Sequence, residues 1–174
     1  MVVTREPGGT PLGEKLRGLL LNEPMHGDTE ALLMFASRRE HLDKVILPAL
    51  AQGKWVISDR FTDASFAYQC GGRGIAEERL RILEDWVHQG FQPDITLLFD
   101  VPVEIGQQRL HASRTGVDSP ALDRFELEHG SFFQKVRDMY LKRAAEHPRR
   151  IRVINSGQPL QVIQAELKEL ILSL

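Results

Sequence analysis

The chain has little that would tie it to a membrane, to an oxidising compartment or to nucleic acid. Its single cysteine, Cys70, excludes an internal disulfide and a zinc site built from several cysteines. No apolar run reaches about 18 residues, and the first residues lack the layout of a secretory signal. With a net charge of −2, the chain has no basic excess for binding nucleic acid by charge alone. We therefore expect a cytoplasmic protein that binds neither membrane nor nucleic acid.

Four short apolar stretches, each ending in polar residues, predict buried parallel strands. At 174 residues, with no repeat, low-complexity tract or linker, the chain is expected to form a single domain over residues 1–174. The predicted strands are Met1 to Arg5, Trp55 to Asp59, Ile95 to Asp100 and Ile151 to Asn155.

Segments of helical period lie between these strands. They predict helices over Thr29 to Gln52, Ala76 to Gln89, Val103 to Arg114, Phe125 to Glu146 and Leu160 to Leu172. Alternating strands and helices indicate an α/β domain with a parallel sheet wrapped by helices. Ligands of such sheets bind beyond the carboxyl ends of the strands, so the residues that close the strands are the first candidates.

Two of these strand ends carry charged residues beside turn-forming ones. The segment Thr4-Arg5-Glu6-Pro7-Gly8-Gly9-Thr10 has glycines that let the backbone approach a ligand, although taken alone it is better explained as an ordinary strand-to-helix turn. Asp59 and Arg60 could hold Mg²⁺ and clamp a phosphate, or form a strand-end ion pair of little consequence.

Further candidates lie on helices and in a basic segment. Gln69 offers one donor and one acceptor, which suits the edge of a pyrimidine, while Phe35 and Arg38 share a helix face suited to stacking on a base and reading its carbonyl oxygen. Phe35 as an ordinary core residue is the competing interpretation. The basic segment of about residues 109–124 is predicted to be a lid that closes over a transferring phosphoryl group, or else a solvated loop.

Read in order, several segments resemble the bacterial thymidylate kinases from about Val2 to Pro159. They are TREPGGTP, LMFASRREHL, SDRFTDASFAYQCGGRG, PDITLLFD and LDRFE. The resemblance implies a P-loop kinase fold with three layers, a five-stranded parallel sheet wrapped by helices, assembled as a homodimer. It implies ATP and dTMP as substrates, with Mg²⁺ as cofactor.

The resemblance also implies roles for single residues. Glu6 is similar to the acidic residue that faces the reacting centre and serves as a second candidate for the metal, with a cis bond to Pro7. Arg17 and Arg60 resemble the arginines that hold the dTMP phosphate, and Asp59 resembles the residue that holds the metal, directly or through water. Arg38, Gln69 and Ser65 correspond to groups that read thymine, and Tyr68 to the ring under the deoxyribose. Arg114, with Arg109 as a second candidate, falls in the lid that supplies the catalytic arginine.

Two departures from the family pattern matter. Many members place the stacking residue four positions before the arginine, where this chain has Met34 rather than Phe35. The family also begins with a strand, a G-x-x-x-x-G-K-[ST] loop and a helix, roughly thirty residues in all. The sequence given contains no such loop, since its Gly53-Lys54 pair is followed by Trp55. The expectation is a fragment or a gene model that begins inside the second strand.

The predicted reaction is transfer of a phosphoryl group from ATP to dTMP, giving dTDP. Two alternatives stay open: a relative of the deoxynucleoside kinases, and a non-catalytic dTMP-binding protein that has lost its ATP loop.

Overall fold

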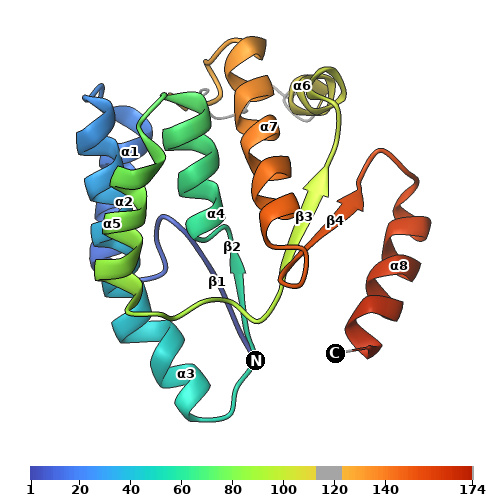
Figure 1. Ribbon diagram of the computed structural model, residues 1–174, viewed down its shortest axis with the longest axis horizontal. Coiled ribbons are helices and arrows are strands. Elements are labelled where there is room, and N and C mark those ends of the chain that lie inside the picture. Colours follow the sequence, from blue (N-terminus) through green and yellow to red (C-terminus); the bar gives the residue numbers. More distant parts are fainter. Residues whose placement is uncertain (113–122, 174) are drawn as a thin grey trace. The chain divides into compact units, whose positions relative to one another are not determined.

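The computed structural model of the protein describes residues 1–112 and 123–173 (Figure 1). The chain falls into two compact units, Met1–Gln92 with Leu122–Met139 and Pro93–Ala121 with Tyr140–Leu174. The predicted single domain over residues 1–174 stays a prediction. The first unit contains β1 (Val2–Arg5), α1 (Pro11–Asn22), α2 (Gly27–His41), η1 (Leu42–Ile46), α3 (Leu47–Ala51), β2 (Val56–Asp59), α4 (Thr62–Ser65), η2 (Phe66–Gly72) and α5 (Glu77–His88). The second contains β3 (Thr96–Asp100), α6 (Val103–Ala112), β4 (Ile151–Asn155) and α8 (Leu160–Leu172), and residues of α7 (Gly130–Glu146) belong to both.

β1 and β2 form a parallel pair in which Arg5 lies opposite Asp59. The backbone N–H of Glu6 donates to the carbonyl oxygen of Asp59 at 2.9 Å, so the pairing continues one residue past β1. The carboxyl ends of both strands therefore meet, and the loops that follow them start from the same edge. The strand boundaries agree with the predicted ones to within one residue.

The loop between β1 and α1 is held at both ends. The Glu6–Pro7 peptide bond is cis, which confirms the expectation drawn from the sequence. The side chain of Thr10 caps α1 by accepting from the N–H of Gly13, and Pro11 stands in the first turn, where a missing N–H costs nothing. Glu14 of α1 accepts from the backbone N–H of Gly9 at 3.0 Å, which fixes the loop against the helix.

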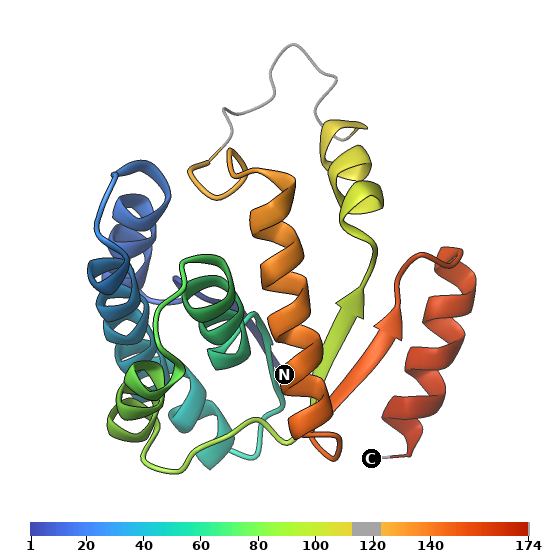
Figure 2. The same ribbon diagram turned by 45° about the horizontal axis from the view of Figure 1, so that its top comes forward.

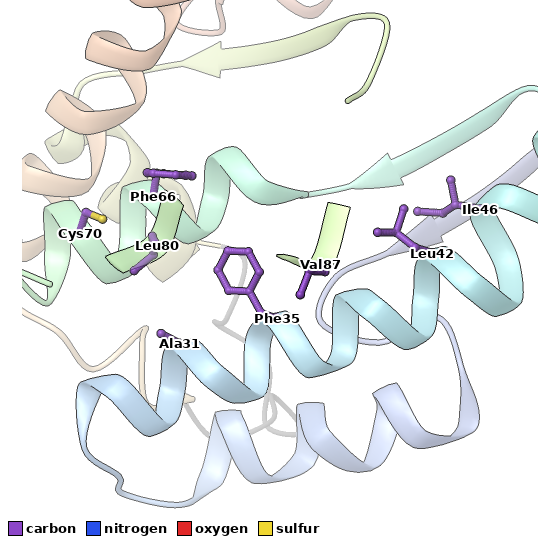
Figure 3. Close-up of a cluster of buried hydrophobic side chains, with 8 residues drawn as sticks. All are labelled: Ala31, Phe35, Leu42, Ile46, Phe66, Cys70, Leu80 and Val87. Atoms are coloured by element: carbon purple, nitrogen blue, oxygen red, sulfur yellow. The ribbon is translucent and has the colours of Figure 1, made fainter. Parts of the chain in front are cut away.

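The hydrophobic core of the first unit gathers α2, η1, η2 and α5. Figure 3 shows Phe35 projecting from the long helix toward the elements that face it. Ala31 and Phe35, four residues apart on α2, face this core, whereas Leu32 between them is 55% exposed. The cluster consists of Ala31, Phe35, Leu42, Ile46, Phe66, Cys70, Leu80 and Val87 (Figure 3).

The helix predicted over Thr29 to Gln52 is interrupted by a π-helical turn. It begins at Gly27, two residues earlier than predicted, and passes through η1 before α3. Pro48 stands in the first turn of α3 and has no N–H to donate to the preceding turn. The loss of that backbone hydrogen bond gives a physical reason for the wider turn just before it.

The start of the helix predicted over Phe125 to Glu146 is wrong. α7 begins at Gly130, and residues 124–127 form a turn instead. The carboxylate of Asp123 accepts from the backbone N–H groups of Phe125 and Glu126, both at 2.9 Å. An aspartate that satisfies these N–H groups stabilises a turn in place of a helix.

In the second unit, β3 and β4 form another parallel pair, from Thr96 opposite Ile151 to Asp100 opposite Asn155 (Figure 2). The carbonyl oxygen of Asp100 accepts from both the N–H and the hydroxyl of Ser156. Parallel strands joined through helices confirm the predicted α/β class. No helix in the described part of the chain is long and apolar enough to cross a membrane.

Candidate active site

A buried ion pair connects the loop after β1 to α2. Oε2 of Glu6 lies 2.7 Å from Nε of Arg38, and the two side chains are 3% and 2% exposed. Nη2 of Arg38 donates to the hydroxyl of Ser65 at 3.0 Å, and its guanidinium lies 4.7 Å from the ring centre of Phe35. Glu6 therefore fixes the arginine from one side while Ser65 and the aromatic ring fix it from others.

His41 extends this network away from the pocket. Its Nδ1 lies 2.9 Å from Oε1 of Glu6, and its Nε2 lies 2.7 Å from the hydroxyl of Thr4 on β1. A carboxylate only accepts hydrogen bonds, so Nδ1 carries the hydrogen. Gly9, at a φ of 78°, passes so close to this ring that an added Cβ would lie 2.6 Å from Nε2. The loop needs glycine here for both reasons.

A pocket opens beside these groups. Polar residues of the lining come from the loop after β1, from α2, from the residue that follows β2 and from α4 and η2, and aromatic rings lie among them. It is lined by Glu6, Pro7, Met34, Arg38, Arg60, Phe61, Ala64, Ser65, Tyr68, Gln69 and Phe125. Six of the residues proposed from the sequence thus line one pocket, although they are spread over residues 6–69.

Two buried polar atoms of the lining residues have no hydrogen-bond partner among the described residues. They are Nη1 of Arg38, which can only donate, and Oε1 of Gln69, which can only accept. A buried group left without a partner costs about 1–3 kcal/mol of stability, so native proteins rarely keep such groups without a reason. A ligand that accepts from one and donates to the other would satisfy both.

The amide of Gln69 is oriented by a buried carboxylate. Its Nε2 donates to Oε1 of Glu30 at 2.8 Å, and both side chains are 0% exposed. Oε2 of Glu30 accepts from Arg124 at 2.6 Å and from Arg73 at 3.3 Å. Both guanidinium groups also lie over the ring of Phe125, at 4.9 and 5.5 Å from its centre.

Arg60 adopts a backbone conformation that is unusual for any residue but glycine. Its φ is 67°, directly after β2, and its guanidinium lies 5.1 Å from the ring centre of Tyr68. A left-handed conformation at such a residue costs about 1–3 kcal/mol and is found most often at functional sites.

Two further candidate residues lie near Arg60. Asp59 is exposed at the end of β2. Arg17 lies next to this region, since its Nη1 donates to the carbonyl oxygen of Pro7 at 3.1 Å.

Phe35 does not line the pocket. It is 1% exposed and belongs to the core cluster, whereas Met34 lines the pocket four residues before Arg38. Phe61 also lines it, with its ring centre 5.3 Å from the Arg38 guanidinium. The role of Phe35 as a stacking ring stays a prediction, and the apolar side chains that line the pocket include Met34 and Phe61.

The two arginines of the predicted lid belong to other parts of the chain than the pocket residues. Arg109 lies at the end of α6 in the second unit, where its Nη1 donates to the carbonyl oxygen of Ser156 at 2.9 Å. Arg114 lies outside the described residues.

Glu30, His41 and Phe125 were not among the residues proposed from the sequence. Spacing offered a signal for two of them: Glu30, Met34, Arg38 and His41 follow one another at intervals of four, four and three, which puts them on one face of α2. Three polar residues on that face point to a buried polar network. Phe125 gave no comparable signal, because its position depends on the turn at Asp123.

The carboxylates near the pocket differ in their fit to a magnesium ion. Both oxygens of Glu6 already accept from Arg38 and His41, and the side chain is buried, so Glu6 fits a structural role better than a metal ligand. Asp59 is an exposed carboxylate at a strand end next to Arg60, which suits an ion that keeps most of its waters. Among residues 1–112 and 123–173, no group of three or more histidine, cysteine or acidic residues could hold a metal ion.

A solved structure has the same fold. The crystal structure of thymidylate kinase from Ehrlichia chaffeensis matches with a TM-score of 0.76 at 33% identity, over 98% of this chain and 79% of that one. The fold and the pocket define a nucleoside monophosphate kinase, an enzyme of the transferase class. The thymidylate kinase family profile matches residues 1–167.

Curated relatives agree at higher identity. Thymidylate kinase of Cupriavidus necator is 60% identical over 171 residues, which are 98% of this chain and 81% of the relative. Thymidylate kinase of Methylobacillus flagellatus is 58% identical over 170 residues, again 98% and 81%. This chain belongs to the thymidylate kinase family, whose members transfer a phosphoryl group from ATP to dTMP.

Proposed function

We propose that the pocket of the first unit binds dTMP and that this protein transfers the γ-phosphoryl group of ATP to it, giving ADP and dTDP. The observation that carries the proposal is the pair of buried, unpartnered atoms, the donor Nη1 of Arg38 and the acceptor Oε1 of Gln69. Thymine presents a carbonyl oxygen, O4, beside an N–H at N3, which matches a donor and an acceptor. Cytosine presents an amino group beside an unprotonated N3, which reverses both.

The rest of the nucleotide has matching surroundings. Tyr68 lines the pocket beside Gln69, and we assign its ring to the deoxyribose, where it would disfavour a 2′-hydroxyl. Arg60 lines the same pocket and Arg17 binds the carbonyl oxygen of Pro7, which also lines it. We assign both guanidinium groups to the dTMP phosphate, because arginine binds phosphate oxygens through two parallel N–H bonds.

Catalysis in this proposal is positioning plus charge stabilisation, with no covalent intermediate. Arg60 and Arg17 orient the acceptor phosphate so that its oxygen faces the γ-phosphorus. Their positive charge, with that of the lid residue Arg114, offsets the negative charge that spreads over the transferred group. Asp59 would hold Mg²⁺, directly or through water, and the ion would neutralise charge on the phosphate oxygens. Glu6 acts indirectly by holding Arg38 in place for the base.

The test compares acceptors in one assay. With ATP and Mg²⁺, transfer to dTMP should exceed transfer to dCMP and to thymidine, and Arg60→Ala should remove most of it. A preference for thymidine would instead indicate a deoxynucleoside kinase. If calorimetry detects binding of dTMP but no binding of ATP, the protein is a non-catalytic dTMP-binding protein. Equal affinity for dTMP and dCMP would contradict the assignment of the base.

Two further properties are proposals of the same kind. The resemblance to the family supports a homodimer in the cytoplasm. Sedimentation equilibrium of the purified chain measures the assembly directly, and a monomer at micromolar concentration would contradict the homodimer.

A further inference from the structure

Glu30 stands at the centre of the polar contacts behind the pocket. It lies in the first turn of α2 and is 0% exposed, so each of its oxygens must find a donor within the protein. Oε1 accepts from Gln69, and Oε2 accepts from Arg124 and Arg73. Arg73 also pairs with Glu128, so two carboxylates and two guanidinium groups balance in charge.

The polarity of the Gln69 side chain follows from this contact. An amide can turn over and exchange its oxygen and nitrogen, because the two ends have almost the same shape. An ionised carboxylate only accepts hydrogen bonds, so the end of the amide that meets Glu30 must be the NH₂ group. The oxygen then stays away from Glu30, unpartnered and buried, in a residue that lines the pocket.

We propose that Glu30 is the positioning residue that sets base choice: by accepting from Nε2 of Gln69 it holds Oε1 as an acceptor in the pocket, which then selects a base edge that donates there. The inference rests on the proposed function, because it assumes that a pyrimidine nucleotide occupies the pocket. It goes further by assigning selectivity to a residue that does not line the pocket and acts through Gln69.

A substitution that lets residue 30 donate as well as accept tests this role of Glu30. Glu30→Gln keeps the size of the side chain but introduces a group that can also donate. Gln69 can then accept from residue 30 and turn its NH₂ group to the pocket, where it suits an unprotonated N3. The ratio of dissociation constants, dCMP over dTMP, should fall on the order of tenfold, which is about 1.4 kcal/mol. dUMP has the same edge as dTMP and should weaken alongside it.

Calorimetry on four proteins separates this role from a merely structural one: the unaltered chain, Glu30→Gln, Gln69→Ala and the double variant. If Glu30 acts through Gln69, Glu30→Gln by itself strongly changes the ratio of the dissociation constants for dCMP and dTMP. In the Gln69→Ala background the same substitution should change that ratio less than about twofold. An equal change in both backgrounds would overturn the inference, as would an unchanged ratio in Glu30→Gln. Glu30→Asp, which keeps an acceptor-only group, should retain the preference for dTMP.

A measurement on the unaltered protein covers the case in which Glu30→Gln does not fold. The NH₂ protons of Gln69, assigned by their absence in Gln69→Ala, should keep their NMR shifts when dTMP is added, because Glu30 binds them in both states. A large shift would mean that the amide turns on binding, and the inference fails. If the unaltered chain shows no preference for dTMP over dCMP, the proposed base assignment falls first, and the inference falls with it.

Discussion

Oε1 of Glu6 lies 2.9 Å from Nδ1 of His41, and both side chains are almost completely enclosed by protein. The other oxygen of Glu6 accepts from Arg38, which we assign to the base, so the contact with His41 helps to hold Glu6 and through it Arg38 in place. His41→Phe should lower the free energy of unfolding by about 1–3 kcal/mol, since a buried carboxylate oxygen loses its donor. Urea unfolding measures the loss.

Thr4→Val is the matched control for that variant. It removes only the hydroxyl at the far end of the chain of contacts, 2.7 Å from Nε2 of His41, and leaves Glu6 paired. Its cost should be smaller, about 0.5–1.5 kcal/mol. A larger loss in Thr4→Val than in His41→Phe would show that the carboxylate does not depend on the histidine.

Stability should fall in mild acid because of His88. Burial of this imidazole, and next the positive charge of Arg38, hold its pKa below the ordinary 6.5. The unfolded chain therefore binds a proton at a higher pH than the folded one, so stability is full above pH 6.5 and declines as pH falls from there to the lowered pKa. Urea unfolding at a series of pH values, with and without His88→Gln, should show a shallower decline in the variant. Identical slopes would rule out this source.

Arg60 allows backbone strain to be separated from side-chain function. Arg60→Ala and Arg60→Gly remove the same guanidinium, but only glycine tolerates a φ of 67° without cost. The free energy of unfolding should therefore be about 1 kcal/mol higher in the glycine variant than in the alanine variant. Both should lose dTMP binding, so a gain in stability would accompany a loss of function. Equal stability of the two variants would argue against strain at this position.

Two glycines in helical segments should respond oppositely to alanine. A Cβ at Gly71 in η2 would lie 2.7 Å from the carbonyl oxygen of Lys135 and 2.8 Å from Cβ of Met139, so Gly71→Ala should destabilise by about 1–3 kcal/mol. A Cβ at Gly18 in α1 meets nothing within 4 Å. Gly18→Ala should therefore stabilise by about 0.5–1 kcal/mol, because glycine is a poor helix former. Thermal unfolding distinguishes the two signs.

The strands and most helices could be predicted from the sequence because their signal is local. The short apolar runs that end at Arg5 and Asp59 are typical of buried strands, and each of them forms one. The helical period predicted the helix that carries the buried Phe35. The start of α7 could not be predicted in this way, since Phe125 and Glu126 fit a helical pattern. Their N–H groups instead bind the carboxylate of Asp123, a choice between two nearly equal local structures.

The residues of the candidate site likewise differ in whether a local sequence signal identifies them. Arg38, Arg60 and Gln69 were found because they stand in recognisable segments. Glu30 and His41 acquire their importance only from partners 39 and 35 residues away, Gln69 and Glu6. No pattern within a helix reports such a distant contact. Only the spacing along α2 hinted that these side chains belong together.

The π-helical turn η2 carries both Tyr68 and Gln69. Such a turn holds one residue more than an α-helical turn would, so its geometry depends on chain length as well as on chemistry. Deleting one residue there would let the helix close normally, and everything after the deletion would rotate by about 100° around the axis. Tyr68 and Gln69 would both remain in the protein, yet they could no longer both face the pocket in which we assign them to the sugar and the base. The number of residues in η2 therefore constrains this segment as tightly as the identity of its residues does.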